Sequence, residues 1–276
     1  MGERTVSIGA DDVLSASLFD VYDELLVPLV FQSYAEDLAG RMTGMGAGSI
    51  LEIAAGTGAV TRTLADALPA EVAITATDLV PGMIERAGRV GTSRPVTWDV
   101  ADVMSLPYES ESFDVVVCQF GAMFFAPQAG AFAEVRRVLR PGGRFLFSVW
   151  DRLDANEFAD VVCAVAKGMF PEDPPQFLEH TPYGYHDDAA IAADLRAGGF
   201  DAAPSVERME HPSRAARAVE VATAFCAGTP MRNEIESRGP DALATTIAAM
   251  AAALAERFGA VDLEGRTRAV FVAAHR

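Results

Sequence analysis

The chain has 276 residues, of which 50% are hydrophobic and 22% are charged, and its formal net charge is −17 with a single lysine, Lys167. This length and hydrophobic content are enough for one large core with an appended cap. Nucleic-acid affinity depends largely on clustered lysine and arginine, so the acidic balance argues against DNA, RNA and anionic membrane surfaces as partners.

The cysteines and the apolar runs indicate a cytoplasmic protein. Cys118, Cys163 and Cys226 are isolated from one another and lack the paired spacing of metal ligands, so we expect three reduced, mostly buried thiols and no metal. No apolar run reaches the roughly 18 residues that a membrane span needs. The N-terminus lacks the basic-then-apolar pattern of a signal peptide.

Apolar runs alternate with amphipathic segments through the first part of the chain. The pattern predicts strands at 49–54, 72–77, 95–99, 113–119 and 144–150, and helices at 59–68, 81–90 and 128–139. This alternation is typical of a parallel sheet with helices on both faces, so the predicted fold is a doubly wound, Rossmann-like α/β sheet. The third helix has the clearest end, because Leu139-Arg140-Pro141-Gly142-Gly143 supplies a stop and a turn before the strand at 144–150.

The second half of the chain adds two strands and further helices. We expect a helical cap at 151–185, a helix at 189–197, a strand within 204–210, an alanine-rich helical stretch at about 214–258 and a last strand at 267–274. With these, the sheet has seven strands. The alanine-rich stretch is interrupted at Gly228-Thr229-Pro230 and Gly239-Pro240, and we expect it to cover a sheet edge or a substrate pocket.

A turn of small residues follows the first predicted strand. It reads Leu51-Glu52-Ile53-Ala54-Ala55-Gly56-Thr57-Gly58, and Asp78 comes later, at the end of the second strand. Glycines let the backbone approach a ligand closely, and a carboxylate at the next strand end can accept hydrogen bonds from both ribose hydroxyls. This arrangement indicates a nucleoside site. Thr61 replaces the third glycine of the dinucleotide fingerprint, which argues against a nicotinamide oxidoreductase, and Glu52 favours a ligand with positive charge.

Three more motifs follow the glycine turn in order. They are Asp78 with Pro81-Gly82-Met83, Ala101-Asp102 ahead of Leu106-Pro107, and Phe113 to Gln119 leading to Leu139–Gly143. Together the four motifs resemble the class I S-adenosylmethionine-dependent methyltransferases, specifically the small-molecule branch similar to ubiquinone and menaquinone biosynthesis methyltransferases. Ala54 departs from the family pattern, because it replaces the first glycine of the Gly-x-Gly-x-Gly turn.

The resemblance implies a site for S-adenosyl-L-methionine, with S-adenosyl-L-homocysteine as product. The implied contacts are Tyr22, Glu52, Ala54, Gly56, Gly58, Asp78, Leu79, Met83, Asp102, Val103 and Gln119. Asp78 would clamp the ribose, and Asp102 would pair with the adenine amino group. Both carboxylates could instead form turns, and Met83 could fill the core instead of touching the ligand.

Methyl transfer mainly requires the enzyme to align the acceptor and exclude water, because a sulfonium methyl is already electrophilic. We take Gln119, at the carboxyl end of the fourth strand, and His186 as the candidate catalytic residues, and a structured loop as the alternative for His186 and His180. An apolar stripe in the cap predicts a small, apolar or aromatic methyl acceptor, although such a stripe is also typical of packing; it consists of Phe158, Val161, Val162, Val165, Met169 and Phe170.

The sequence thus predicts a methyltransferase with four parts. They are an N-terminal helical lid at 1–45, a donor-binding core at 46–150, the cap insertion at 151–185, and the C-terminal part of the sheet at 186–276 with its helical insertion at 214–258. The alternative is a non-catalytic S-adenosylmethionine-binding or scaffold protein of the same fold. We leave a homodimer open.

Overall fold

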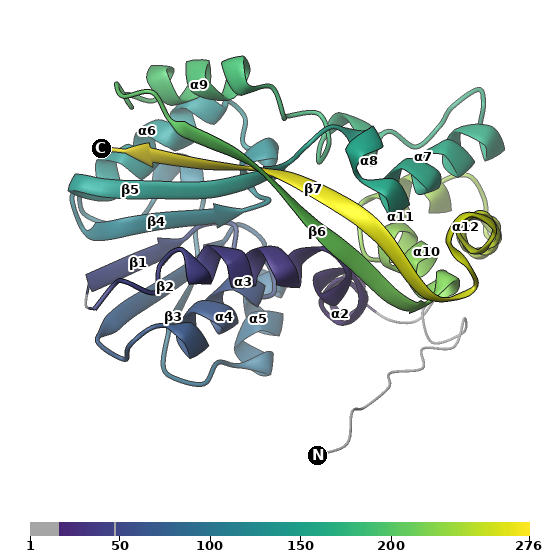
Figure 1. Ribbon diagram of the computed structural model, residues 1–276, viewed down its shortest axis with the longest axis horizontal. Helices are drawn as coiled ribbons and strands as arrows, with labels where there is room; N and C mark the ends of the chain where they lie inside the picture. The colour runs from purple at the N-terminus through teal and green to yellow at the C-terminus, as the bar shows by residue number, and fades with distance from the viewer. Residues whose placement is uncertain (1–16, 47) are drawn as a thin grey trace.

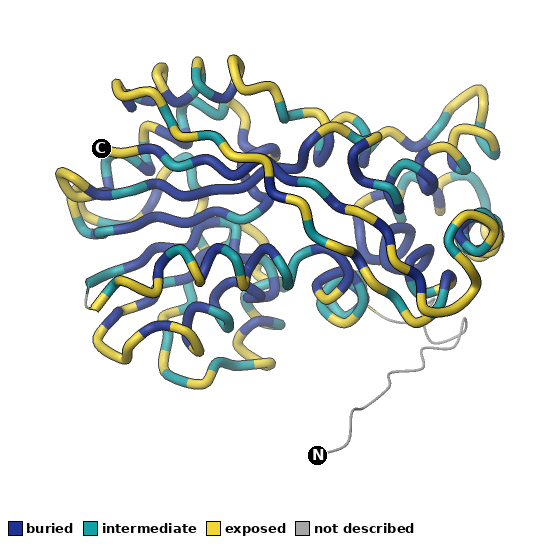
Figure 2. The backbone as a smooth tube through the Cα atoms, in the orientation of Figure 1, coloured by how far each residue is buried: buried dark blue, intermediate teal, exposed yellow. Residues whose placement is uncertain are grey.

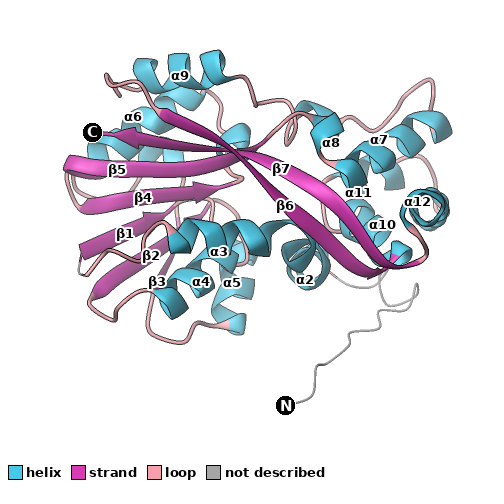
Figure 3. Cartoon of the chain, in the orientation of Figure 1, coloured by secondary structure: helices cyan, strands magenta, loops and turns pink. Residues whose placement is uncertain are grey.

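The computed structural model describes residues 17–46 and 48–276. They form one seven-stranded sheet in the order β3-β2-β1-β4-β5-β7-β6 (Figures 1 and 3). Strands β1 to β5 pair in parallel, whereas β7 is antiparallel to both β5 and β6. The prediction of a seven-stranded, mostly parallel α/β sheet is confirmed. The part of the predicted lid at 1–16 lies outside the described residues.

The strands are β1 (Gly48–Glu52), β2 (Val72–Asp78), β3 (Thr97–Val100), β4 (Phe113–Gln119), β5 (Leu139–Trp150), β6 (Ser205–Arg217) and β7 (Val261–His275). The α-helices are α2 (Leu18–Val21), α3 (Gln32–Gly40), α4 (Ala59–Ala67), α5 (Pro81–Val90), α6 (Gln128–Val138), α7 (Glu157–Met169), α8 (Phe177–His180), α9 (Asp188–Ala197), α10 (Ala218–Ala227), α11 (Met231–Glu236) and α12 (Ala242–Phe258). A π-helix, η1 (Tyr22–Phe31), joins α2 to α3, and the 3₁₀ helices are η2 (Val103–Ser105), η3 (Ala122–Phe124) and η4 (Leu153–Ala155).

The core lies along the middle strands of the sheet (Figure 2). Val115, Val116, Val117 and Cys118 of β4 are all buried, which is typical of a parallel strand covered by helices on both faces. Helix α6 turns the apolar side chains of Ala131, Phe132, Val135 and Val138 toward this core at helical spacing.

Strands β6 and β7 continue past the sheet as a two-stranded arm that reaches the cap helices (Figure 1). Beyond Ala269, which pairs with Trp150, β7 pairs only with β6, down to Val261 opposite Arg217. The prediction of helix from 214 is therefore wrong for residues up to 217. Alternating burial continues through Met209 and Ser213, and the partner strand satisfies the backbone groups that a helix would have paired internally.

Strand β5 also begins earlier than predicted. Leu139 already pairs with Phe113 of β4, and the register shifts between Phe113 and Val115. Residues 140–143 therefore lie within the strand and are not a separate turn, although Gly142 keeps a positive φ of 78°. The end of the preceding helix at Val138 agrees closely with the prediction.

Helices α7 and α8, which precede β6, and α10 to α12, which follow it, gather at the far end of the arm and are together called the cap (Figure 1). The predicted alanine-rich stretch forms α10, α11 and α12, separated at the predicted glycine and proline residues, and α10 packs against both α12 and the π-helix η1. In residues 17–46 and 48–276, no helix combines the length and the apolar character needed to cross a membrane. The cap and η1 enclose the space beyond the carboxyl ends of β1, β2 and β4.

Candidate functional site

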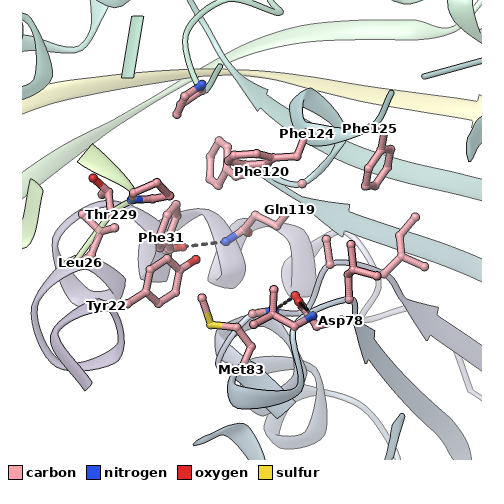
Figure 4. Close-up of a pocket in the computed structure, with 18 of the residues that line it drawn as sticks. Tyr22, Leu26, Phe31, Asp78, Met83, Gln119, Phe120, Phe124, Phe125 and Thr229 are labelled. Atoms are coloured by element: carbon pink, nitrogen blue, oxygen red, sulfur yellow. Dashed lines mark hydrogen bonds between the residues drawn. The ribbon is translucent and has the colours of Figure 1, made fainter. Parts of the chain in front are cut away.

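A cavity of about 620 Å³ opens where β1, β2 and β4 end. Ligand sites of open parallel sheets lie at this edge. The turns after the strands form one wall, and η1 and the cap form the others, as Figure 4 shows. One end holds the carboxylates of Asp78 and Asp102, and we call it the carboxylate end. The opposite end, the aromatic end, is lined by Phe120, Phe124, Phe125, Trp150, Phe177 and Tyr183.

Asp78 links the end of β2 to the glycine turn. Its Oδ2 accepts a hydrogen bond from the Gly56 N–H at 2.8 Å, and its Oδ1 accepts one from the Val80 N–H at 2.8 Å. Burial raises the pKa of the Asp78 carboxyl, while the two backbone donors partly offset that effect. The carboxylate has about four lone-pair sites, so these turn contacts leave it able to accept hydrogen bonds from a ligand.

Ala54 adopts the backbone conformation that the family assigns to glycine. Its φ is 52°, in the left-handed region that costs a residue with a Cβ about 1–2 kcal/mol. Room for its methyl group comes from Gly121, since a Cβ on Gly121 would lie 2.5 Å from the Cβ of Ala54 and 2.8 Å from Cys118 Sγ. The departure from the glycine pattern is thus matched by a glycine in the turn after β4.

Two predicted contacts lie away from the main cavity. Gly58 is not among its lining residues; a Cβ at Gly58 would instead come within 2.7 Å of the Trp98 ring. This glycine allows the turn after β1 to pack closely against Trp98 of β3. Glu52 does not line the main cavity either, and its Oε2 accepts a hydrogen bond from Thr61 at 2.6 Å.

Glu52 does line a small polar cavity of about 20 Å³ beside the main one. The two cavities share Tyr22, Phe31, Ala54 and Gln119. Burial raises the pKa of Glu52 to about 8, the charge of Asp78 adds to the rise, and the Thr61 hydrogen bond and Arg62 oppose it. Without a ligand the Glu52 carboxyl is therefore largely protonated at neutral pH, and a cationic group in this space would lower its pKa and favour the ionised form.

Gln119 lines both cavities and carries an unpaired amide oxygen. Its Nε2 donates to the carbonyl oxygen of Phe31 at 3.1 Å, and because a carbonyl can only accept, the orientation of the amide is fixed. The other amide atom, Oε1, is buried and has no hydrogen-bond partner among the described residues. Buried acceptors are normally paired, so this oxygen marks a place for a ligand donor.

Tyr22 lies opposite Gln119 on the π-helix η1, with its ring turned into the cavity (Figure 4). Its hydroxyl lies 3.4 Å from the position of a Cβ on Gly56. Burial and the nearby carboxylates raise the pKa of Tyr22. Tyr34 is different: it is buried, does not line the cavity and donates to Thr267 Oγ1 at 3.1 Å, so it anchors its helix.

The remaining predicted donor contacts lie at the carboxylate end. Leu79, Met83, Asp102 and Val103 all line the cavity, and 63% of the Leu79 surface is exposed there. Asp102 also caps η2, accepting a hydrogen bond from the Met104 N–H at 2.9 Å with one of its two oxygens. The turn-forming role and a ligand contact are therefore compatible for this residue.

The two histidines of the cap loop do not reach the cavity. His186 Nδ1 lies 3.0 Å from the carbonyl oxygen of Tyr183, and His180 Nδ1 lies 3.2 Å from that of Gln176. Neither lines the cavity, whereas Tyr183, between them in the sequence, does. His186 thus lies in a structured loop, as the alternative interpretation has it, whereas His180 is the last residue of α8.

The aromatic end contains residues that the sequence did not single out. Phe120, with a φ of 54°, stacks on Trp150 at a centroid distance of 3.7 Å, and Phe31 and Tyr183 flank this pair. From the predicted apolar stripe of the cap, no member lines the cavity; Phe158, for example, packs edge-on against Phe258. Among the described residues that line the cavity, none is Lys, Arg or His.

Comparisons with known proteins agree with this geometry. A family profile described as a methyltransferase domain matches residues 51–147. A ubiquinone/menaquinone biosynthesis C-methyltransferase of Burkholderia mallei is 32% identical over 201 residues, which cover 68% of this chain and 81% of that protein. The chain belongs to the class I S-adenosylmethionine-dependent methyltransferases. The enzyme of the same name from Dinoroseobacter shibae is 28% identical over 201 residues, covering 67% of this chain and 79% of its own.

Solved structures show the same fold for this methyltransferase. A Haemonchus contortus phosphoethanolamine N-methyltransferase in complex with S-adenosyl-L-methionine matches 99% of this chain and 58% of its own, with a TM-score of 0.59 and 17% identity. The Bacillus subtilis YcgJ protein matches 88% of this chain and 98% of its own, with a TM-score of 0.54 and 15% identity. The enzyme uses S-adenosyl-L-methionine as methyl donor, and no comparison favours a non-catalytic scaffold.

Proposed function

We propose that this methyltransferase transfers a methyl group from S-adenosyl-L-methionine to a small, uncharged acceptor that is aromatic or apolar. The observation that carries the proposal is the composition of the large cavity. Carboxylates lie at one end and aromatic rings at the other, and no cationic side chain lines it among the described residues. A buried carboxylate or phosphate on the acceptor would find no cationic partner among these residues, and burial of a charge without one is costly.

The residues of the carboxylate end fit the donor. Asp78 has lone pairs for the ribose hydroxyls, Asp102 has an oxygen for the adenine amino group, and Leu79, Met83 and Val103 offer apolar surface for the adenine ring. The ammonium of the methionine part would find acceptors at Gln119 Oε1 and the Glu52 carboxylate beside the small cavity. We assign donor roles to these residues, and we assign Ala54 and Gly56 to the adjoining wall.

The bound donor supplies an electrophilic sulfonium methyl, so the chain has mainly to orient the acceptor and exclude water. Tyr22, Phe31 and Gln119 lie between the two ends of the cavity, where the acceptor and donor would meet (Figure 4). Burial raises the pKa of Tyr22 and of Tyr183, so both phenols are neutral hydrogen-bond donors at physiological pH and not bases. We therefore assign catalysis to alignment, with Gln119 as the orienting residue.

The division of the chain into lid, donor-binding core, cap and C-terminal part of the sheet is part of the same proposal. A cytoplasmic location is supported by the three buried cysteines, none of which is in a disulfide. The net charge of −17 supports an enzyme that works without nucleic acid. A homodimer stays a prediction.

The donor assignment is tested by calorimetry with S-adenosyl-L-methionine. We expect Asp78→Ala to weaken binding by about 1.5–3 kcal/mol, the range for hydrogen bonds to a charged group. It should also lower the melting temperature, because the Gly56 and Val80 N–H groups lose their acceptor. Unchanged donor affinity would remove Asp78 from the site.

The acceptor assignment is tested by incubation with methyl-labelled donor and a panel of phenols, quinols and amines. The proposal expects label on at least one neutral ring compound. Donor binding without transfer to any member of a broad panel would instead favour the non-catalytic alternative.

A further inference from the structure

One carboxylate of the N-terminal segment ties η1 to both helices of the donor site. Asp23 follows Tyr22 directly, and only 8% of its side chain is exposed. Its Oδ1 accepts a hydrogen bond from Arg62 of α4 at 3.1 Å, and its Oδ2 accepts one from Arg86 of α5 at 3.2 Å. A carboxylate that is largely shielded and shared by two guanidinium groups is held far more firmly than an exposed ion pair.

Arg62 carries this connection into the glycine turn. Its second terminal nitrogen, Nη1, donates to the carbonyl oxygen of Thr57 at 2.6 Å, between Gly56 and Gly58. Asp23 is therefore linked through one side chain to the turn that forms the wall of the cavity. Because Tyr22 is its neighbour, the same link places the Tyr22 ring over Gly56.

Arg86 makes the second half of the connection. Besides Asp23, it donates to Asp20 at 2.6 Å and to Glu24 at 3.1 Å, so one guanidinium pairs with three carboxylates of α2 and η1. Phe19 adds an apolar contact to the same helix, since its ring occupies the space that a Cβ on Gly82 would take. Helix α5 carries Met83 at the carboxylate end of the cavity, so α2 and η1 are fixed to both sides of the donor site.

We infer that Asp23, Arg62 and Arg86 are positioning residues that hold Tyr22 over the donor and so set donor affinity and release. We call these three side chains the ionic latch. The inference concerns how the proposed donor site holds its ligand, and it rests on the donor site assigned under the proposed function. Disrupting it lowers the fraction of molecules with η1 in place, and the apparent dissociation constant rises in inverse proportion to that fraction. A change of this kind in the dissociation constant appears mainly as a change in the rate at which the ligand dissociates.

The test measures binding of S-adenosyl-L-homocysteine by calorimetry and its release by stopped-flow tryptophan fluorescence. Trp150 lines the cavity and Trp98 packs on Gly58, so both reporters of the chain are close to the site. Asp23→Asn and Arg86→Met should each raise the dissociation constant at least about fivefold, the lower range for coupling between sites. Arg86→Lys, which keeps the charge, should lie between Arg86→Met and wild type.

Arg41→Met is the matched control. Arg41 belongs to the same N-terminal part of the chain and pairs with Asp37 at 2.6 Å and Glu207 at 2.8 Å, but it does not line the cavity. The Arg41→Met variant should therefore bind the donor with wild-type affinity. In steady-state kinetics, the latch variants should show a raised KM for the donor and a nearly unchanged kcat, because the aromatic end is untouched.

The wild-type enzyme provides an independent readout if a variant fails to fold. Its product release should accelerate with added NaCl, because the pairs of Arg86 with Asp20 and Glu24 are partly exposed and are screened by salt. A release rate that does not depend on salt, or latch variants that lower the melting temperature yet bind and release like the Arg41→Met control, would overturn the latch. Failure of the wild type to bind the product at all would instead overturn the donor site, and the latch with it.

Discussion

At the scale of single residues, Gln119 combines a fixed orientation with a free acceptor atom. The Phe31 carbonyl holds its Nε2, and its Oε1 is left for a ligand. We predict that Gln119→Ala lowers kcat/KM about tenfold or more, the effect of losing a buried hydrogen bond of about 1–3 kcal/mol. His180→Ala and His186→Ala should each lower kcat by less than about tenfold, because a general base would account for about 10²–10⁴. A histidine variant that is clearly the worst of the three would contradict this ranking.

Glu52 gives the enzyme a pH-dependent stability. Burial raises its pKa to about 8, so between about pH 4.5 and 8 the folded state holds a proton that the unfolded state has lost. The free energy of unfolding must then fall as pH rises through this window. We predict that Glu52→Gln, measured without donor, flattens this slope and raises stability at pH 8, by about 1.4 kcal/mol for each pKa unit that is removed. Denaturant unfolding of both proteins between about pH 5 and 9 checks this prediction. A Glu52→Gln variant whose free energy of unfolding depends on pH as steeply as that of the wild type would contradict it.

At the scale of elements, the turns after β1 and β4 are fitted to each other through Ala54 and Gly121. We predict that Gly121→Ala destabilises the fold by about 1–3 kcal/mol, because its new methyl group would overlap that of Ala54. Adding Ala54→Gly should recover part of this loss, whereas the contact with Cys118 should keep the recovery incomplete. A double-mutant cycle in denaturant checks the coupling, and strictly additive effects would refute it.

Features that depend on nearby residues were predictable from the sequence. The glycine turn, Asp78 at the end of β2, Gln119 at the end of β4 and the end of α6 all follow from local patterns, and each lies close to where it was expected. The first part of the sheet could be predicted for the same reason, since its strands are short apolar runs bounded by turn residues.

Features that depend on distant partners were not predictable. The close contact of Gly58 with Trp98 joins the turn after β1 to β3, and the extension of β6 exists because β7, at the far end of the chain, pairs with it. The aromatic end is assembled from the turn after β4, η3, β5, α8 and the loop after α8, so no local pattern identified Trp150 or Phe177. The sequence pointed to Tyr183 only weakly, through its position between His180 and His186.

At the scale of the whole molecule, the N-terminal segment that we propose as a lid is also part of the core. Leu26, Leu29 and Val30 of η1 are buried in the main core, and Ser213 Oγ of β6 donates to the Leu29 carbonyl oxygen at 2.6 Å. Each buried aliphatic side chain contributes about 1.5–3 kcal/mol, against a typical total of about 5–15 kcal/mol. We predict that deletion of residues 1–30 abolishes cooperative unfolding, whereas Tyr22→Ala weakens donor binding with a smaller loss of stability. A truncated protein with the wild-type melting temperature would show that the segment is dispensable.

The central claim is that one cavity brings the donor to an uncharged aromatic acceptor. It is tested most directly by competition between two acceptors with the same ring, one neutral and one carrying a carboxylate, at saturating S-adenosyl-L-methionine. An unpaired buried charge costs several kcal/mol, and a difference of about 1.4 kcal/mol already changes a rate tenfold. The account predicts a kcat/KM at least about a hundredfold higher for the neutral compound. Equal transfer to both, or preference for the anionic one, would contradict it.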